Sequence, residues 1–153
     1  MPPYIVDASI FIRIWRHHPP DIFRRLWSQL DRAIADGHVR SPEEVLHELE
    51  DGEDDLAETL AARGGLFIPL DDALARATEA VQAACPLTDA AGERSRGDPF
   101  VVACAQLTRG TVVSGERPRK APDAPPKIPD ACEQLHVPHL DWFGFLRATG
   151  WDL

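Results

Sequence analysis

Four carboxylates occupy positions where an α/β protein would place its chemistry: Asp7, Glu48, Asp98 and Glu116. Each follows an apolar run typical of a strand or lies in the first turns of a helical pattern. In open sheets of parallel strands, ligands bind beyond the carboxyl ends of the strands. Carboxylate oxygens suit hard cations such as Mg²⁺, and four of them together would repel one another unless a cation were bound. Composition and spacing do not show that the four converge.

Each of these acids also has a purely structural interpretation. Asp98 precedes Pro99, and an aspartate there can cap a helix without any other role. Glu48 belongs to an acidic helix and Glu116 to a loop, where solvated charges are common. Asp7 is harder to explain in this way, because an acid directly after a buried apolar strand is costly without a partner. Asp7 is therefore the strongest single candidate.

The segments that must position these acids alternate between strand and helix. Strands are expected at 4–6, 39–40, 66–69, 111–113 and 137–140, and helices at 10–15, 21–36, 42–49, 55–62, 71–85, 98–109, 130–135 and 142–148. Such alternation predicts an α/β fold with a mainly parallel sheet. No linker divides the chain, so residues 1–153 are expected to form a single domain.

Local patterns predict how two helices begin and what the last helix buries. Asp21 is expected to cap the second helix, and Ser41 the third, with Glu44 completing a capping box. Phe143 is expected to lie in the core together with the aromatic residues near it in the last helix.

The charge of the chain is unevenly distributed. The 153 residues carry 25 Asp and Glu against 16 Lys and Arg, for a net charge of −9. Nine of the acids lie within residues 43–58, which hold no Lys or Arg, so the remainder of the chain is balanced. An acidic chain is not an obvious nucleic-acid binder, because phosphate attracts positive surface. Arginine predominates among the basic residues and suits bidentate phosphate contacts, although a simple composition bias explains it equally well.

Cysteine usage and hydropathy indicate the compartment. The three cysteines have no CxxC spacing, which favours buried free thiols over a zinc site or a disulfide framework. No apolar run approaches the roughly 20 residues that cross a bilayer, so no membrane association is expected. The apolar N-terminal stretch contains Asp7 and Arg13, unlike a signal peptide. A cytoplasmic protein is expected.

Five segments, in order along the whole chain, resemble the motifs of PIN domains. They are Tyr-Ile-Val-Asp-Ala-Ser-Ile-Phe-Ile (4–12), Val-Leu-His-Glu-Leu (45–49), Gly-Asp-Pro-Phe-Val-Val-Ala-Cys-Ala (97–105), Thr-Val-Val-Ser-Gly-Glu (111–116) and Lys-Ile-Pro-Asp-Ala-Cys (127–132). The last is similar to a toxin-like bacterial PIN branch labelled a domain of unknown function. The order, the spacing and the total length of the five segments all agree with that family.

The resemblance implies a three-layer α/β/α sandwich and a metal-dependent endoribonuclease like the VapC-type toxins of toxin–antitoxin pairs. The implied cofactor is Mg²⁺ or Mn²⁺, and the implied partners are an RNA substrate, a cognate antitoxin and a second copy of the chain in a homodimer. The matched residues are Asp7, Glu48 and Asp98 as core acids, Glu116 as a fourth where Asp is commoner, Asp130 as a candidate fifth, and Ser9 and Ser114 as polar helpers. The arginines expected to contact RNA are Arg13, Arg16, Arg96, Arg117 and Arg119.

Other functions stay open on the sequence alone. A haloacid-dehalogenase-like phosphotransferase also has an Asp after its first strand, but that class has a second Asp where this chain has Ser9. A non-catalytic PIN-like scaffold and a receiver-type metal-binding regulatory domain are the non-enzyme alternatives. A receiver has an acidic pair before the first strand's Asp, where this chain has Met1-Pro2-Pro3.

Overall fold

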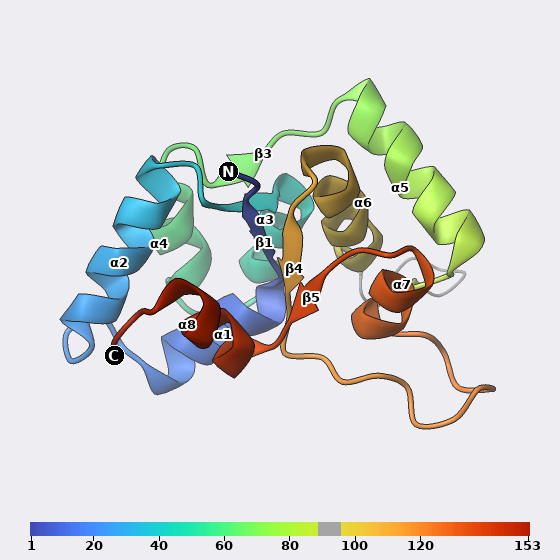
Figure 1. The fold of residues 1–153 in the computed structure, drawn as a ribbon. Coiled ribbons are helices and arrows are strands. Elements are labelled where there is room, and N and C mark those ends of the chain that lie inside the picture. Colours follow the sequence, from blue (N-terminus) through green and yellow to red (C-terminus); the bar gives the residue numbers. More distant parts are fainter. Residues whose placement is uncertain (89–95) are drawn as a thin grey trace.

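The computed structural model of the chain describes residues 1–88 and 96–153. Within these residues the strands form one five-stranded parallel sheet of order β3-β2-β1-β4-β5 (Figure 1). The strands are β1 (Tyr4–Val6), β2 (Val39–Pro42), β3 (Phe67–Ile68), β4 (Thr111–Val113) and β5 (His139–Leu140). The predicted α/β fold with a parallel sheet is thereby confirmed.

Helices lie on both sides of the sheet, as parallel strands joined by crossover connections require. They are α1 (Ala8–His17), α2 (Arg24–Ala35), α3 (Glu43–Glu50), α4 (Leu56–Ala61), α5 (Asp72–Ala84), α6 (Asp98–Thr108), α7 (Ile128–Gln134) and α8 (Trp142–Thr149). Figure 1 shows α1, α2, α4 and α8 on one side and α5, α6 and α7 on the other. The described part of the chain is therefore an α/β sandwich.

The central strands are apolar because both of their faces are covered. Ile5 and Val6 of β1, and Val112 and Val113 of β4, are almost completely buried. The chain leaves β1 toward β2 and later returns to β1's other edge as β4. The strand order therefore reverses between β1 and β4, and a ligand crevice is expected beyond their carboxyl ends.

Ser41 does not cap a helix. It is the third residue of β2 and is fully buried, and its Oγ donates a hydrogen bond to the carbonyl of Val6 at 2.7 Å. Helix α3 begins two residues later, after Pro42, without a side-chain cap. Glu44 does not complete a capping box either, since the Ser41 N–H donates to the carbonyl of Leu66 at 2.9 Å.

Two further local predictions were wrong. Asp21 lies in a turn, and α2 begins only at Arg24, with Phe23 at the N-cap and no side-chain cap. Phe143 is 53% exposed, whereas Trp142 and Phe145 are buried. The helical repeat of α8 turns Phe143 outward between its two buried neighbours.

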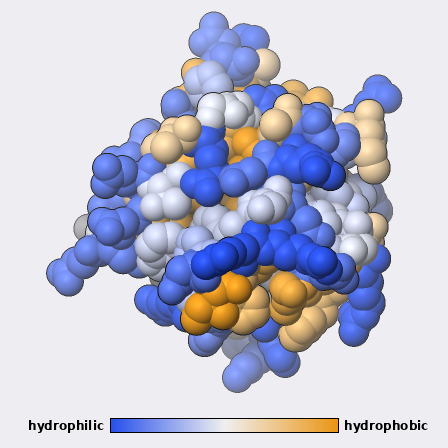
Figure 2. Space-filling view, turned by 90° about the vertical axis from the view of Figure 1, so that its left-hand side faces the viewer, coloured by the Kyte–Doolittle hydropathy of each residue, from blue (hydrophilic) through white to orange (hydrophobic). Residues whose placement is uncertain are grey.

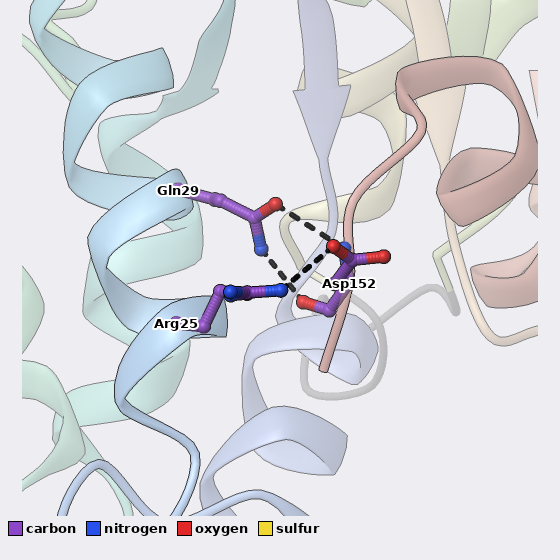
Figure 3. A network of polar contacts seen from close by, with 3 residues as sticks. All are labelled: Arg25, Gln29 and Asp152. Atoms are coloured by element: carbon purple, nitrogen blue, oxygen red, sulfur yellow. Dashed lines mark hydrogen bonds and ion pairs between the residues drawn. The ribbon is translucent and has the colours of Figure 1, made fainter.

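The C-terminus is held against α2 by exposed polar contacts (Figure 3). Arg25 pairs with the carboxylate of Asp152 at 3.0 Å. The Gln29 side chain donates to the Asp152 carbonyl at 2.7 Å and accepts from its N–H at 3.2 Å. These contacts fasten the last residues of the chain, and their exposure limits what they contribute to stability.

The side of the molecule formed by α2 and α4 is mainly hydrophilic, with hydrophobic groups gathered along its lower edge (Figure 2). No helix in residues 1–88 and 96–153 combines the length and the apolar character that crossing a membrane requires.

Candidate functional site

Asp7 and the Ser114-Gly115-Glu116 segment meet where β1 and β4 end side by side. The Asp7 N–H donates to the carbonyl of Val113 at 3.0 Å, which extends the sheet by one bond. Ser9 then joins the two strand ends, because its Oγ donates to Asp7 Oδ2 at 2.7 Å and accepts from the Gly115 N–H at 2.9 Å. The residue predicted as a polar helper thus holds Asp7 beside the segment that carries Glu116.

Asp7 is a buried acid with one unsatisfied oxygen. Its side chain caps α1 by accepting from the Ser9 N–H at 3.3 Å, and the residue is 3% exposed. Oδ1 is buried and has no hydrogen-bond partner in the described structure. Burial raises the pKa of Asp7, the Ser9 hydroxyl lowers it, and the charge of Glu116 raises it further. An unpaired buried carboxylate oxygen is costly, so it requires an explanation beyond helix capping.

Glu48 approaches the same place from α3. Its Oε1 accepts a hydrogen bond from the Gly97 N–H, immediately before α6. A Cβ on Gly97 would lie 2.5 Å from that oxygen, so the approach depends on glycine. Burial raises the pKa of Glu48, the Gly97 N–H lowers it, and the charges of Asp7 and Glu116 raise it. Three of the four predicted acids therefore act on one another electrostatically.

Asp98 is the first residue of α6 and is 5% exposed. It is not the N-cap, because that position belongs to Gly97. The capping interpretation of Asp98 was therefore wrong. Asp98 and Glu116 both line a cleft of about 750 Å³ under the loop that follows β4.

Glu116 and Asp130 fasten that loop to the start of α7. Glu116 Oε2 accepts from the Ile128 N–H at 2.9 Å. Asp130 Oδ2 accepts from the N–H groups of Lys127 at 2.8 Å and Arg119 at 3.0 Å. The structure thus gives Asp130, the candidate fifth acid, a capping role.

A family model described as a domain of unknown function, DUF4411, matches residues 4–153. The chain belongs to the DUF4411 family. No curated protein matches the chain. The family description assigns no activity, so the chemistry of this DUF4411 domain must be argued from its site.

The predicted arginines do not all lie at the acids. Arg117 and Arg119 line the cleft below the loop, together with Lys120 and Lys127. Arg96 is paired with Asp51 at 2.6 Å and still lowers the pKa of Glu48. Arg16 is exposed at the last turn of α1. Arg13 lies over the ring of Phe143, with its guanidinium carbon 5.3 Å from the ring centroid.

Two polar residues near the site were missed from the sequence. His139 Nε2 lies 2.8 Å from Ser114 Oγ, and burial lowers the pKa of His139. A single histidine in a short strand gives no local signal of such a pairing.

Glu44 lies four residues before Glu48 on α3, and burial raises the pKa of Glu44. That spacing places both acids on one helix face and could have revealed it.

The acids do not form a ready-made metal centre. Among residues 1–88 and 96–153, no group of three or more His, Cys, Asp or Glu side chains is arranged to hold a metal ion. Two of the carboxylates are instead turned toward backbone N–H groups, Glu48 toward Gly97 and Glu116 toward Ile128. The site therefore consists of mutually repelling acids, some of which backbone donors hold in place.

Proposed function

We propose that this DUF4411 domain is a metal-dependent endoribonuclease of the PIN type, which hydrolyses RNA phosphodiester bonds. The observation that carries the proposal is the buried, unpartnered Oδ1 of Asp7, beside Glu116 and Glu48 at the point where the strand order reverses. A structural acid would be paired or exposed. An acid that waits for a cation is expected to be buried, unsatisfied and surrounded by other acids.

The donor set fits a hard divalent cation. Asp7, Glu48 and Asp98 would hold Mg²⁺ or Mn²⁺, and Glu116 would be the fourth ligand, all through the carboxylate oxygens that such ions prefer. When bound, the ion would offset negative charge on the reacting phosphate and activate water. Ser9 orients Asp7, and the Gly97 and Ile128 N–H groups hold Glu48 and Glu116 in the metal-free chain. The proposal requires the last two carboxylates to exchange these N–H groups for the ion.

The test is cleavage of a labelled RNA by the purified chain with Mg²⁺, with EDTA, and after Asp7→Asn. Asp21→Asn is the control, because it removes one exposed acid in the turn before α2. We expect cleavage by the parent and the control only with the metal, leaving 5′-phosphate ends, and none by Asp7→Asn. Undiminished cleavage by Asp7→Asn, or cleavage in EDTA, would refute the mechanism.

A non-catalytic scaffold is the second candidate, and the scattered orientation of the acids favours it. A scaffold would show no cleavage by any variant while the chain remains folded. Binding of Mn²⁺ without cleavage would separate a metal-binding regulatory domain from a scaffold without metal.

The toxin role rests on the resemblance to VapC-type proteins. On this proposal the chain is cytoplasmic and homodimeric, and an antitoxin with a basic segment covers the acids. Its three cysteines are free and buried, as a reducing compartment allows. The exposed acids of the α3–α4 turn, Glu53, Asp54 and Asp55, would attract such a partner. Growth arrest on expression, relieved by a small neighbouring reading frame and absent with Asp7→Asn, is the expected result.

A further inference from the structure

A second cleft shares the Gly115–Pro118 segment, and with it Glu116, with the cleft under the loop. It encloses about 490 Å³, and its wall includes Arg13 of α1, Phe143 of α8 and Arg117. We call it the aromatic cleft, and the cleft under the 115–127 loop the loop cleft. Glu116 lines both clefts, so an extended polymer that lies across Glu116 would occupy both of them.

Phe143 gives the aromatic cleft an exposed flat surface. The residue is 53% exposed, although its neighbours Trp142 and Phe145 are 2% and 3% exposed. The guanidinium of Arg13 lies 5.3 Å from the ring centroid, so a planar cation and an aromatic ring stand together. Proteins that bind single strands stack bases on such aromatic rings, and arginine adds cation–π attraction.

The charges of the two clefts differ in a way that assigns different parts of a nucleotide to them. The aromatic cleft balances Arg13 and Arg117 against Glu116 and Asp141, which suits an uncharged base. The Asp141 carboxylate already accepts from the Gly144 N–H at 2.7 Å, where it caps α8.

The loop cleft is lined by more basic than acidic side chains. Four basic side chains face Asp98 and Glu116 there: Arg117, Arg119, Lys120 and Lys127. This excess of positive charge suits phosphate groups, which are recognised mainly through Lys and Arg.

We propose that the aromatic cleft is a nucleobase subsite for single-stranded nucleic acid, with one base stacked at Phe143 and the adjoining phosphates along the loop cleft. The inference rests on the proposed function and adds to it that the substrate is unpaired at the site. Bases inside a duplex are stacked on one another and cannot reach Phe143. Phe143 and Arg13 are then positioning residues, which hold the nucleic-acid strand. They are distinct from the acids of the proposed cation site.

Binding tests this inference independently of cleavage. Asp7→Asn protein is titrated with a fluorescein-labelled ten-nucleotide single-stranded RNA by fluorescence anisotropy, and the same titration is made with Phe143→Ala and Phe143→Tyr added. Leu107→Ala is the matched control, because Leu107 is 52% exposed on α6. Circular dichroism confirms folding of each variant.

We expect Phe143→Ala to weaken binding by about 5- to 150-fold, the range for loss of one stacked base. Phe143→Tyr should restore it, and Leu107→Ala should leave it unchanged. The double variant Arg119→Gln and Lys120→Gln should instead change the salt dependence. The slope of the logarithm of the binding constant against the logarithm of the salt concentration should become shallower by about 0.7 for each lost phosphate contact. Phe143→Ala should not change that slope.

The outcomes separate this inference from the proposed function. Equal affinity of Phe143→Ala and Leu107→Ala overturns the nucleobase subsite and leaves the nuclease to be judged by cleavage. No measurable RNA binding, or equal binding of a matched duplex, also overturns the subsite. Loss in Phe143→Ala with rescue by Tyr supports the subsite, even where the parent protein cleaves no RNA and the nuclease proposal fails.

Discussion

The substitution Asp7→Asn should stabilise the metal-free protein. Asparagine retains an oxygen that can accept the Ser9 N–H and hydroxyl, which Asp7 holds at 3.3 and 2.7 Å. It removes the charge that burial and Glu116 disfavour. The amide nitrogen of Asn would take the place of Oδ1, which has no hydrogen-bond partner in the described structure, so the substitution removes the charge and not the buried polar atom.

The size of the effect follows from that charge. The free energy of unfolding at pH 7 should rise by about 1.4 kcal/mol for each unit by which folding raises the pKa of Asp7. The pKa of Asp7 is raised above its ordinary value of 3.8 in the folded state. The folded protein therefore binds the proton more tightly than the unfolded chain, and this contribution to stability is present below pH 3.8 and lost as the pH rises through the folded pKa. The advantage of Asn should be small in acid and full at neutral pH.

Urea denaturation in EDTA at several pH values measures this difference, with Asp21→Asn as the control for removing an exposed acid. Magnesium should reverse the order, because an ion at 100 times its Kd stabilises the parent by about 2.7 kcal/mol. A parent protein that is more stable than Asp7→Asn in EDTA at every pH would show that Asp7 is a satisfied structural acid.

Three other substitutions or treatments test the structure. Ser41→Ala should lower the free energy of unfolding by about 1–2 kcal/mol, because it removes a buried hydrogen bond to Val6; an unchanged urea midpoint would contradict the buried position. Asp152→Ala should cost less than about 1 kcal/mol, since its ion pair is exposed, and a larger loss in the same assay would mean that the C-terminus is docked more firmly. Burial raises the pKa of Cys104 and Cys132 to about 12, so iodoacetamide at pH 8 should modify both only after unfolding. Rapid modification of the native protein, followed by mass spectrometry, would show that these thiols are accessible.

The sheet could be predicted from the sequence because each strand is a short apolar run and helices separate the runs. Asp7 could be singled out for the same reason, because an acid directly after a short apolar run can be recognised in the sequence. Ser41 shows where this reasoning fails. Its Ser-Pro-Glu-Glu pattern is typical of a helix start, but Ser41 and Pro42 pair with Phe67 and Ile68 in β3. Such pairing between distant residues overrides the local preference.

The orientations of the candidate acids could not be predicted from the sequence. Glu48 and Gly97 are 49 residues apart, and no local pattern indicates that one accepts a hydrogen bond from the other. The pairing of Ser114 with His139 spans 25 residues and is equally invisible. Phe143 was misplaced because aromatic residues are usually buried, while the phase of α8 decides which of them is not.

The most direct test of the central claim is the anomalous diffraction of a crystal of the chain grown with excess Mn²⁺. We expect a manganese peak in contact with a carboxylate oxygen of Asp7 and of at least one of Glu48, Asp98 and Glu116, at the short metal–oxygen distances of a hard cation. Glu48 should then have left the Gly97 N–H that it contacts in the metal-free chain. A crystal with manganese in excess and no peak within reach of Asp7 would contradict the claim that these acids form a cation site.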